Sequence, residues 1–327
     1  MQTGSSMPAR SDEEGVRQPI VSVVTLTRNR REQLSTLLQS LRCQDFSARE
    51  TIVVDNASTD GTLDMLRTRF PEVRIVESVI NAGTYSYTLG ITQAKGKYII
   101  LIDDDGLPAR CDWISELVAR FEHNSRLGAA ACLIRMADTG RIADDSPQFI
   151  PEGSAMAGFP TCAYNGTGAA LRASAIAGLL PIYPQQYFRS WIELHLCTRL
   201  LSAGWDVRLF PTIEVWHCRP SGSSTPPLSY YGLRNYLWYV ATFYPWPDWL
   251  TEAMHFVASR AKQVAQGKVA PSLIGRSLVD SAAGMRRVLR GRQPLSHGTM
   301  EYMRAVRREA NWSECVPMEI PTLERPT

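Results

Sequence analysis

The chain has 327 residues, 44% hydrophobic and 20% charged, a composition typical of a folded globular protein rather than a disordered or fibrous one. Its seven cysteines form no CxxC pair, and their odd number argues against a disulfide framework and against a structural zinc site. No run of about 18 apolar residues exists to span a bilayer, and residues 1 to 18 lack the apolar stretch of a signal peptide. We therefore expect a cytoplasmic protein.

The formal net charge of +3 is unevenly distributed along the chain. Residues 1 to 250 carry 23 Lys and Arg against 25 Asp and Glu, whereas residues 251 to 310 carry 11 against 4. A basic C-terminal segment beside many aromatic residues indicates attraction to an anionic surface. A solvated helical face is the simpler alternative.

The expected elements alternate between strands and helices after a polar, disordered tail at residues 1 to 18. Residues 21 to 27 (VSVVTLT) are β-branched and apolar, which predicts a strand. Leucines recur at helical spacing over residues 31 to 43 and predict a helix. The alternation continues with strands at 51 to 55, 73 to 78 and in KYIILI, and with helices after DNASTDGT and over 84 to 94.

The second half of the chain has a less regular pattern. We expect a helix over 111 to 121, a strand over 128 to 136, a loop over 137 to 165, a helix near 190 to 203, and two short strands in WDVRLFP and IEVWHC. The segment RPSGSSTPP at 219 to 227 has the composition of a linker, and an aromatic, basic and mainly helical segment follows it. The sequence thus predicts an α/β fold with a mostly parallel central sheet, helices on both faces and a helical C-terminal extension. The expected boundaries are 1–18, 19–220 and 221–327.

Polar clusters follow three of the expected strands: TRNRR, DNAS and DDD. Ligands bind at the carboxyl ends of strands in such sheets, so the clusters predict a nucleotide site. The consecutive carboxylates Asp103 to Asp105 need a cation or several donors nearby, and Mg²⁺ or Mn²⁺ holding a diphosphate would satisfy them and neutralise a leaving group. A solvated acidic turn is the alternative.

Four ordered segments together resemble the family 2 glycosyltransferases, which have the GT-A fold. The segments are TLTRNRREQLSTLLQSL, VVDNASTDGT, NAGTYSYTLGITQAKGKYIILIDDD and the block from GTGAALR to EVWH. The resemblance covers about residues 20 to 240. It implies that residues 19–220 form a GT-A domain that binds a nucleotide sugar and transfers its sugar.

The resemblance also implies roles for individual residues. The nucleotide sugar would contact the first loop, the pair after the second strand, a turn and two carboxylates: Leu26, Thr27, Arg28, Asp55, Asn56, Asn81, Gly83, Asp103 and Asp104. Asp103 and Asp105 occupy the ends of the DxD motif, and the expected metal ligands are Asp103, Asp105 and His217. Arg30 and Arg31 have the alternative role of opening a helix on its solvent side.

The catalytic motif departs from the family pattern, because Ile192 and His195 stand where acids are usual. Glu193 is retained and is the expected general base of an inverting transfer. Trp191 and His195 are candidate acceptor contacts. A structural role is the other main interpretation of His195, and a share in proton transfer is a further alternative. The departure keeps a second hypothesis open, namely a catalytically silent nucleotide-sugar-binding or scaffold protein. A nucleotidyltransferase is disfavoured because no Gly-rich signature bearing Lys or Arg lies near the first strand.

The segment YYGLRN at 230 to 235 resembles a motif that follows the catalytic domain in bacterial rhamnosyltransferase-like members. The aromatic and basic residues after it are typical of an interfacial helix on anionic lipid, at the inner face of the cell membrane, or else of helices packed on the sheet. We expect a nucleotide-sugar donor, a glycan or lipid-linked acceptor, a role in cell-surface polysaccharide or glycolipid synthesis, and no nucleic-acid partner. The donor sugar and the oligomeric state stay open.

Overall fold

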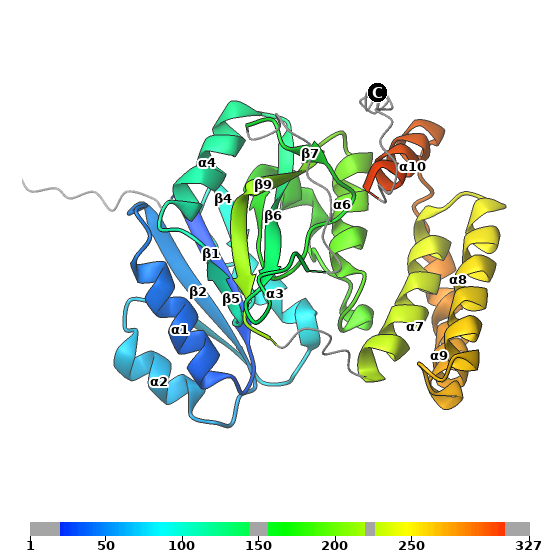
Figure 1. The fold of residues 1–327 in the computed structure, drawn as a ribbon, viewed down its shortest axis with the longest axis horizontal. Helices are drawn as coiled ribbons and strands as arrows, with labels where there is room; N and C mark the ends of the chain where they lie inside the picture. Colours follow the sequence, from blue (N-terminus) through cyan, green and yellow to red (C-terminus); the bar gives the residue numbers. More distant parts are fainter. Residues whose placement is uncertain (1–19, 144–155, 220–225, 311–327) are drawn as a thin grey trace, which may run out of the picture.

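A computed structural model describes residues 20–143, 156–219 and 226–310 (Figure 1). The expected tail and most of the expected linker lie outside these residues. A single sheet with strand order β3-β2-β1-β4-β8-β6-β9-β5 forms the centre, with β7 paired to β9. Its strands are β1 (Val21–Thr27), β2 (Arg49–Asn56), β3 (Arg74–Ser78), β4 (Tyr98–Leu101), β5 (Gly106–Pro108), β6 (Leu127–Met136), β7 (Phe159–Pro160), β8 (Ala169–Arg172) and β9 (Asp206–His217).

The N-terminal half of the sheet is parallel. β1 pairs with β2 on one side and β4 on the other, and β2 pairs with β3. Val21, Val23 and Val24 of β1 are completely buried, as expected for a strand covered on both faces. The register places Thr27 opposite Asp55, so the loops that follow β1 and β2 leave the same edge of the sheet. Our strand expectations for this half are confirmed.

The other half of the sheet is mixed. β8 is antiparallel to β4 and β6, β9 is parallel to β6, and β5 and β7 are antiparallel to β9. The two short strands expected between 205 and 218 are in fact one strand, β9. Its pairing with β6 jumps from Phe210 to Glu214, so Pro211, which cannot donate to the ladder, falls in an irregularity and does not end the strand.

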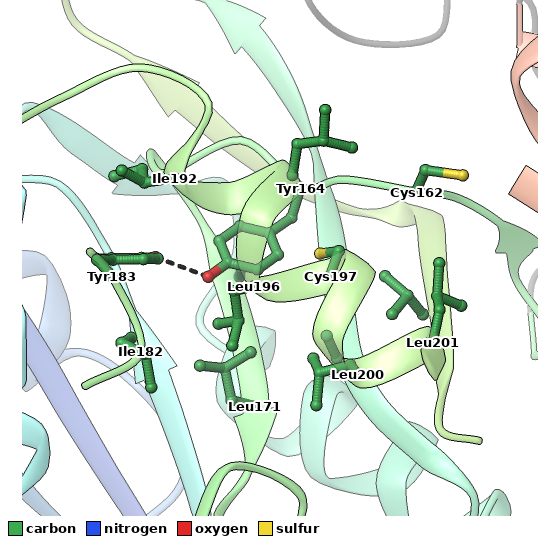
Figure 2. Packing of buried hydrophobic residues seen from close by; sticks show 14 of the residues in the cluster. Cys162, Tyr164, Leu171, Ile182, Tyr183, Ile192, Leu196, Cys197, Leu200 and Leu201 are labelled. Atoms are coloured by element: carbon green, nitrogen blue, oxygen red, sulfur yellow. Dashed lines mark hydrogen bonds between the residues drawn. The ribbon is translucent and has the colours of Figure 1, made fainter. Parts of the chain in front are cut away.

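Helices cover both faces of the sheet. One core contains the leucine stripe of α1 (Arg31–Arg42) with side chains of α2 (Thr62–Arg69) and α4 (Trp113–His123). The other core contains α3 (Tyr87–Ile91), α5 (Ala173–Ile176) and α6 (Ile192–Ser202). The helix expected over 84 to 94 is shorter, a 3₁₀ turn η1 (Gly83–Ser86) followed by α3. Figure 2 shows how the α6 side chains Leu196, Cys197, Leu200 and Leu201 line the second core.

Four helices complete the described chain: α7 (Pro226–Phe243), α8 (Asp248–Ala265), α9 (Pro271–Arg290) and α10 (His297–Ala310). α8 and α9 pack against α7, and Figure 1 shows the group beside α6 at the edge of the domain. Tyr239, Phe243 and Tyr244 are buried in the core that contains α6, so these rings pack the helices onto the domain, whereas Trp246 is 68% exposed. Within the described residues, no helix is both long and apolar enough to cross a membrane.

Candidate functional site

A cavity of about 1060 Å³ opens at the carboxyl ends of β1, β2 and β4 and extends past α6 to the C-terminal helices. It brings together most of the residues expected from the sequence. Its lining includes Leu26, Thr27, Arg28, Asn56, Asn81, Gly83, Asp103, Asp104, Asp105, Trp191, Glu193 and His217. Two expected site residues, Asp55 and His195, do not line it.

The three consecutive carboxylates face three different partners. Asp103 Oδ1 accepts a hydrogen bond of 2.9 Å from the hydroxyl of Tyr87 on α3. Asp104 Oδ2 accepts one of 2.8 Å from Thr27 Oγ1 at the end of β1. Asp105 turns toward His217 and Arg30. The triplet is therefore divided among neighbouring elements and is not the solvated acidic turn of the alternative hypothesis.

Arg30 is the cation that balances these charges. It precedes α1, and its Nη1 lies 2.9 Å from Asp104 Oδ1 and 2.6 Å from Asp105 Oδ2. The sequence left its role open, and the expected solvent-facing helix start describes only Arg31, which pairs with the exposed Glu32. The signal for Arg30 was its place directly after β1, because the ends of β1 and β4 are neighbours in the sheet.

His217 reaches the triplet through strand pairing. β5 and β9 are antiparallel with Gly106 opposite His217, which brings His217 Nε2 to 3.4 Å from Asp105 Oδ1. The His217 ring also contacts Thr167 Oγ1 at 3.4 Å. A Cβ on Gly106 would lie 2.8 Å from the carbonyl oxygen of Thr167, so this close approach of two backbones needs glycine.

The expected metal set of Asp103, Asp105 and His217 is not assembled as three converging ligands. No group of three His, Cys, Asp or Glu side chains that could hold a metal is found in the described part of the chain. The reason is that Asp103 faces Tyr87, while Asp105 and His217 face each other. The structure therefore provides a carboxylate and an imidazole at the expected place.

The surroundings shift the pKa values of the three carboxyl groups to different extents. Burial raises the pKa of Asp104 to about 6 despite the opposing charge of Arg30. Burial and the charge of Asp105 raise the pKa of Asp103. Burial also acts to raise the pKa of Asp105, but His217 and Arg30 outweigh it, so the pKa of Asp105 lies below its ordinary value. Asp105 is thus the member best suited to bind a cation.

The loop that follows β3 is fastened to β2 by Asn56. Its Nδ2 donates to Asn81 Oδ1 at 2.9 Å, and its Oδ1 accepts from Ala82 N and from Ser86 Oγ. Gly83 has φ +62°, and a Cβ there would lie 2.2 Å from the carbonyl oxygen of Phe188, so the turn requires glycine. Asn56 therefore holds in place the turn from Asn81 to Gly83, both of which line the cavity.

Asp55, the neighbour of Asn56 on β2, is buried beside the cavity. Its Oδ2 accepts from Ser58 N at 3.0 Å, while its Oδ1 is buried and has no hydrogen-bond partner among the described residues. Buried carboxylate oxygens normally accept hydrogen bonds, so this atom is a natural acceptor for a ligand.

Glu193 stands at the middle of the cavity, in the first turn of α6. A Cβ on Gly166 would lie 3.0 Å from Glu193 Oε1 and 3.6 Å from Asp103 Oδ2, so the bare backbone of Gly166 separates the two carboxyl groups. Trp191, which caps α6 with φ 64°, donates through Nε1 to Gly232 O, and its ring packs at a tilt of 48° against Tyr236, with 4.8 Å between ring centroids. Glu193 thus lies between the acidic sheet edge and an aromatic wall.

His195 lies behind this wall and not in the cavity. Its ring packs edge-on against Tyr187 and Phe243 at 5.4 and 4.8 Å between centroids. Burial, with a smaller contribution from the Arg199 charge, lowers the pKa of His195 to about 3, so the imidazole is neutral at pH 7. The geometry fits the structural alternative. Ile192 differs from His195, because it is only 2% exposed, packs in the second core and also borders the cavity; Figure 2 shows it with other members of this core.

Comparison with known proteins gives evidence about the family of this chain that does not depend on the geometry of the site. Residues 22–178 match the model of glycosyl transferase family 2. A putative teichuronic acid biosynthesis glycosyltransferase of Bacillus subtilis is 32% identical over 91 residues, 27% of this chain and 36% of that protein. An uncharacterised glycosyltransferase of Haemophilus influenzae is 29% identical over 115 residues, 34% of this chain and 35% of that protein. The chain thus spans about a third of the length of the curated relatives it matches.

Solved structures share the fold at low sequence identity. The mannosyltransferase of Pyrobaculum calidifontis in complex with GDP-Man and Mn²⁺ superposes with a TM-score of 0.55 at 17% identity, covering 91% of this chain and 89% of that one. S. aureus TarS (1–349) in complex with UDP-GlcNAc gives a TM-score of 0.58 at 17% identity, covering 89% and 88%. The architecture is therefore that of GT-A glycosyltransferases with added C-terminal helices, and residues 22–178 form a domain of glycosyl transferase family 2.

Proposed function

We propose that this chain is a glycosyltransferase that moves a sugar from a nucleoside diphosphate sugar to an acceptor hydroxyl with inversion. The observation that supports this most directly is a single cavity that contains the Asp103–Asp105 edge, His217 and Glu193. Two structural neighbours are in complex with nucleotide sugars, and one relative is named for teichuronic acid biosynthesis, which is consistent with an acceptor in a surface polysaccharide or glycolipid.

The donor would occupy the sheet edge of the cavity. Leu26, Thr27 and Arg28 border it on one side, and the Asn81–Gly83 turn borders it on the other. The buried Oδ1 of Asp55 and the exposed donors of Arg28 suit a base or ribose and a phosphate respectively. GDP and UDP both occur in the neighbours, so we assign the nucleotide class only.

The residues present fit a divalent cation with an incomplete protein ligand set. Asp105 and His217 would hold Mg²⁺ or Mn²⁺, because such ions commonly bind through one or two protein groups together with substrate phosphates and water. When bound, the ion would neutralise the charge that develops on the diphosphate. Arg30, which already pairs with Asp104 and Asp105, lies close enough to this edge to contribute a second positive charge.

Glu193 is the proposed general base. The acceptor oxygen attacks the anomeric carbon, the bond from that carbon to the phosphate oxygen breaks, and its electron pair leaves with the nucleoside diphosphate. Glu193 accepts the proton of the attacking hydroxyl. A single displacement of this kind inverts the anomeric centre. The glycine backbone at Gly166 leaves Glu193 open toward Asp103, at the place where the two substrates would meet.

We also propose that the C-terminal helices touch an anionic membrane. Trp246, Leu250 and Met254 are exposed at 68%, 38% and 55%, and Leu278 and Val279 of α9 are exposed as well. The last turns of α9 carry Arg286, Arg287 and Arg290. Apolar side chains flanked by cations suit a surface of anionic lipid. Replacing these three arginines by glutamine should reduce sedimentation with phosphatidylglycerol vesicles, and equal binding to double-stranded DNA would point to a general polyanion surface instead.

The deciding experiment is ligand-induced thermal stabilisation with UDP-, dTDP- and GDP-sugars, each with and without Mn²⁺. Binding to the folded state raises Tm, so one nucleotide class should stabilise the protein in a Mn²⁺-dependent manner. The shift should be lost in Asp105→Ala and kept in Asp112→Ala, a partly exposed carboxylate that pairs with Arg110 outside the cavity lining. A nucleotide-dependent shift without any sugar transfer would support the silent binding protein, and no shift with any nucleotide would contradict both.

A further inference from the structure

The cavity has a second end, formed by the C-terminal helices, and a guanidinium stands there. Arg307 on α10 lines the cavity together with Val306, Tyr236 and Phe256. Its Nη1 donates to the hydroxyl of Tyr244 at 2.6 Å, and its Nη2 lies 3.4 Å from the hydroxyl of Tyr239. Arginine carries five N–H donors in a planar fork, so this geometry leaves donors for a further partner.

The described groups that contact this guanidinium are neutral. Among the described residues, no Asp or Glu oxygen lies within 4.0 Å of Arg307, whereas Arg304, one turn earlier on α10, pairs with Asp248 at 2.8 Å. Burial raises the pKa of Tyr239 and of Tyr244, so both phenols stay protonated at pH 7. Burial also raises the pKa of the Cys162 thiol to about 11.

A partly buried cation without a counterion is energetically costly, because burial removes its hydration and nothing of opposite charge replaces it. An oxyanion with two oxygens matches the guanidinium fork best, since carboxylates and phosphates accept two parallel hydrogen bonds from it. An anion that enters from the cavity would therefore complement the charge that the described residues leave unbalanced.

A short stretch of chain joins this end to the reacting groups. Residues 161 to 167 all line the cavity. Cys162 contacts α10 through Met303 O, and Gly166 borders Glu193. Figure 2 shows Cys162 and Tyr164 on this stretch beside α6, with Tyr164 bonded to Tyr183. The Cα atoms of Cys162 and Gly166 are at most about 14 Å apart, so one acceptor molecule could reach both ends of the cavity.

We propose that Arg307 binds an anionic group, a carboxylate or a phosphate, on the acceptor. This inference rests on the proposed glycosyltransferase function and specifies its acceptor. Trp191, Tyr236 and Phe256 form an aromatic wall between Glu193 and Arg307 that suits the apolar face of a sugar ring. The hydroxyl that receives the sugar would lie at Glu193 and the charged group at Arg307, because both residues line the same cavity.

The test compares matched probes: phenyl β-glucuronide, phenyl phosphate and the neutral phenyl β-glucoside. Full-length protein is saturated with the nucleoside diphosphate that stabilises it and with Mn²⁺, so that the donor site is filled, and each probe is titrated by calorimetry. At least one anionic probe should bind about tenfold tighter than the glucoside, as expected for one charge-assisted contact. Preference for the glucuronide would assign a carboxylate, and preference for the phosphate would assign a phosphate.

Arg307→Gln should remove the preference, and Arg307→Lys should retain part of it. Arg304→Gln on the same helix should leave it unchanged, because Arg304 pairs with Asp248 outside the cavity lining. Tyr244→Phe keeps the charge but removes the bond that orients it, and should weaken the preference even if Arg307→Gln fails to fold. Equal binding of charged and neutral probes, no binding of either anion, or a preference that survives Arg307→Gln would overturn the proposal.

The two proposals fail in different ways. If no nucleoside diphosphate stabilises the protein, the same titration is run without nucleotide. An Arg307-dependent preference would then keep the anion site while the glycosyltransferase proposal fails. Nucleotide binding and sugar transfer without a preference for anionic probes would keep the transferase and remove the anionic acceptor.

Discussion

The two ends of the cavity carry charges of opposite sign, and they differ in how far the described residues balance that charge. At the sheet edge, Asp104 and Asp105 already have a cation from the protein itself, because Arg30 lies within 2.9 Å of both. At the helical end, the polar groups that contact Arg307 among the described residues are phenols and a thiol. The first end is an acidic site that is partly neutralised, and the second is a cation whose described contacts are uncharged. The proposed metal–diphosphate complex and anionic acceptor would complement them.

This difference also fits the proposed role of Glu193. It lines the cavity near both the acidic edge and the aromatic wall, so a base there would reach the acceptor hydroxyl while the leaving group was held on the opposite side. Substitutions of Glu193, Arg30, Gly166 and His195 test this difference between the two ends.

Glu193→Gln should have the largest effect. The amide keeps the shape of the side chain but cannot accept the hydroxyl proton, so transfer should slow by about 100- to 10,000-fold. Nucleotide-induced stabilisation should remain, because the donor residues are unchanged. Glu122→Gln, on the surface next to Lys97, is the matched control. A Glu193→Gln variant with near-normal kcat would show that another group takes the proton.

Arg30→Met tests whether the protein's own cation stabilises the acidic end. Without the guanidinium, Asp104 and Asp105 lose their internal cation, and the free energy of unfolding in EDTA should fall by about 1–2 kcal/mol, a value moderated by the 46% exposure of the Arg30 side chain. Mn²⁺ should restore more stability to this variant than to the wild type. Arg31→Met, which removes only an exposed pair with Glu32, should change neither value. Urea denaturation with and without Mn²⁺ measures both, and equal Mn²⁺ effects in the two variants would contradict the pairing argument.

Gly166→Ala tests the contact between the two ends. The added methyl group would lie 3.0 Å from Glu193 Oε1 and 3.6 Å from Asp103 Oδ2, which is tight for Glu193. We expect several-fold slower transfer with intact nucleotide binding and a Tm close to wild type. Gly178→Ala, where an added Cβ meets nothing within 4 Å, is the control for the general effect of the substitution. Unchanged kcat in Gly166→Ala would mean that Glu193 works in another position.

The sequence predicted the acidic end far better than the cationic one. Strand periodicity and the rule that ligands gather at carboxyl ends are local signals, and residue order alone was enough for them to place Thr27, Asn56 and Asp103–Asp105 on one edge. The sequence did not assign Arg30 to the site, because an arginine at the start of a helix is expected in any case. Only the pairing of β1 with β4 shows that Arg30 lies beside the carboxylates. The same is true of β9, where a proline suggested two strands and pairing with β6 made one.

Arg307 had no local signal. It belongs to the basic helical segment, where most cations are exposed, and its place in the cavity depends on α10 sharing a core with α6, although 94 residues separate the two helices. For His195, the position in the motif suggested an acceptor contact, whereas its ring packs against Tyr187 and Phe243 and does not line the cavity. Burial of a particular side chain is a tertiary property that residue spacing cannot supply.

The smallest effect on activity is expected from His195→Phe. The folded protein holds the imidazole neutral, with a pKa of about 3 against an ordinary value of 6.5, because burial disfavours the charged form. Between these two values the unfolded chain binds a proton that the folded chain does not, so stability is present above pH 6.5 and is lost as the pH falls, by about 1.4 kcal/mol per unit for this group.

His195→Phe removes this proton uptake. Between pH 7 and pH 5 the wild type should lose about 2 kcal/mol more unfolding free energy than the variant, as measured by urea denaturation at both pH values. Transfer at pH 7 should stay within about twofold, because His195 does not line the cavity and its ring is replaced by another ring between Tyr187 and Phe243. The exposed His123, replaced by Gln, should leave the pH dependence as it is. A large loss of rate in a folded His195→Phe protein would instead make the imidazole a positioning group for Glu193, two residues before it on α6.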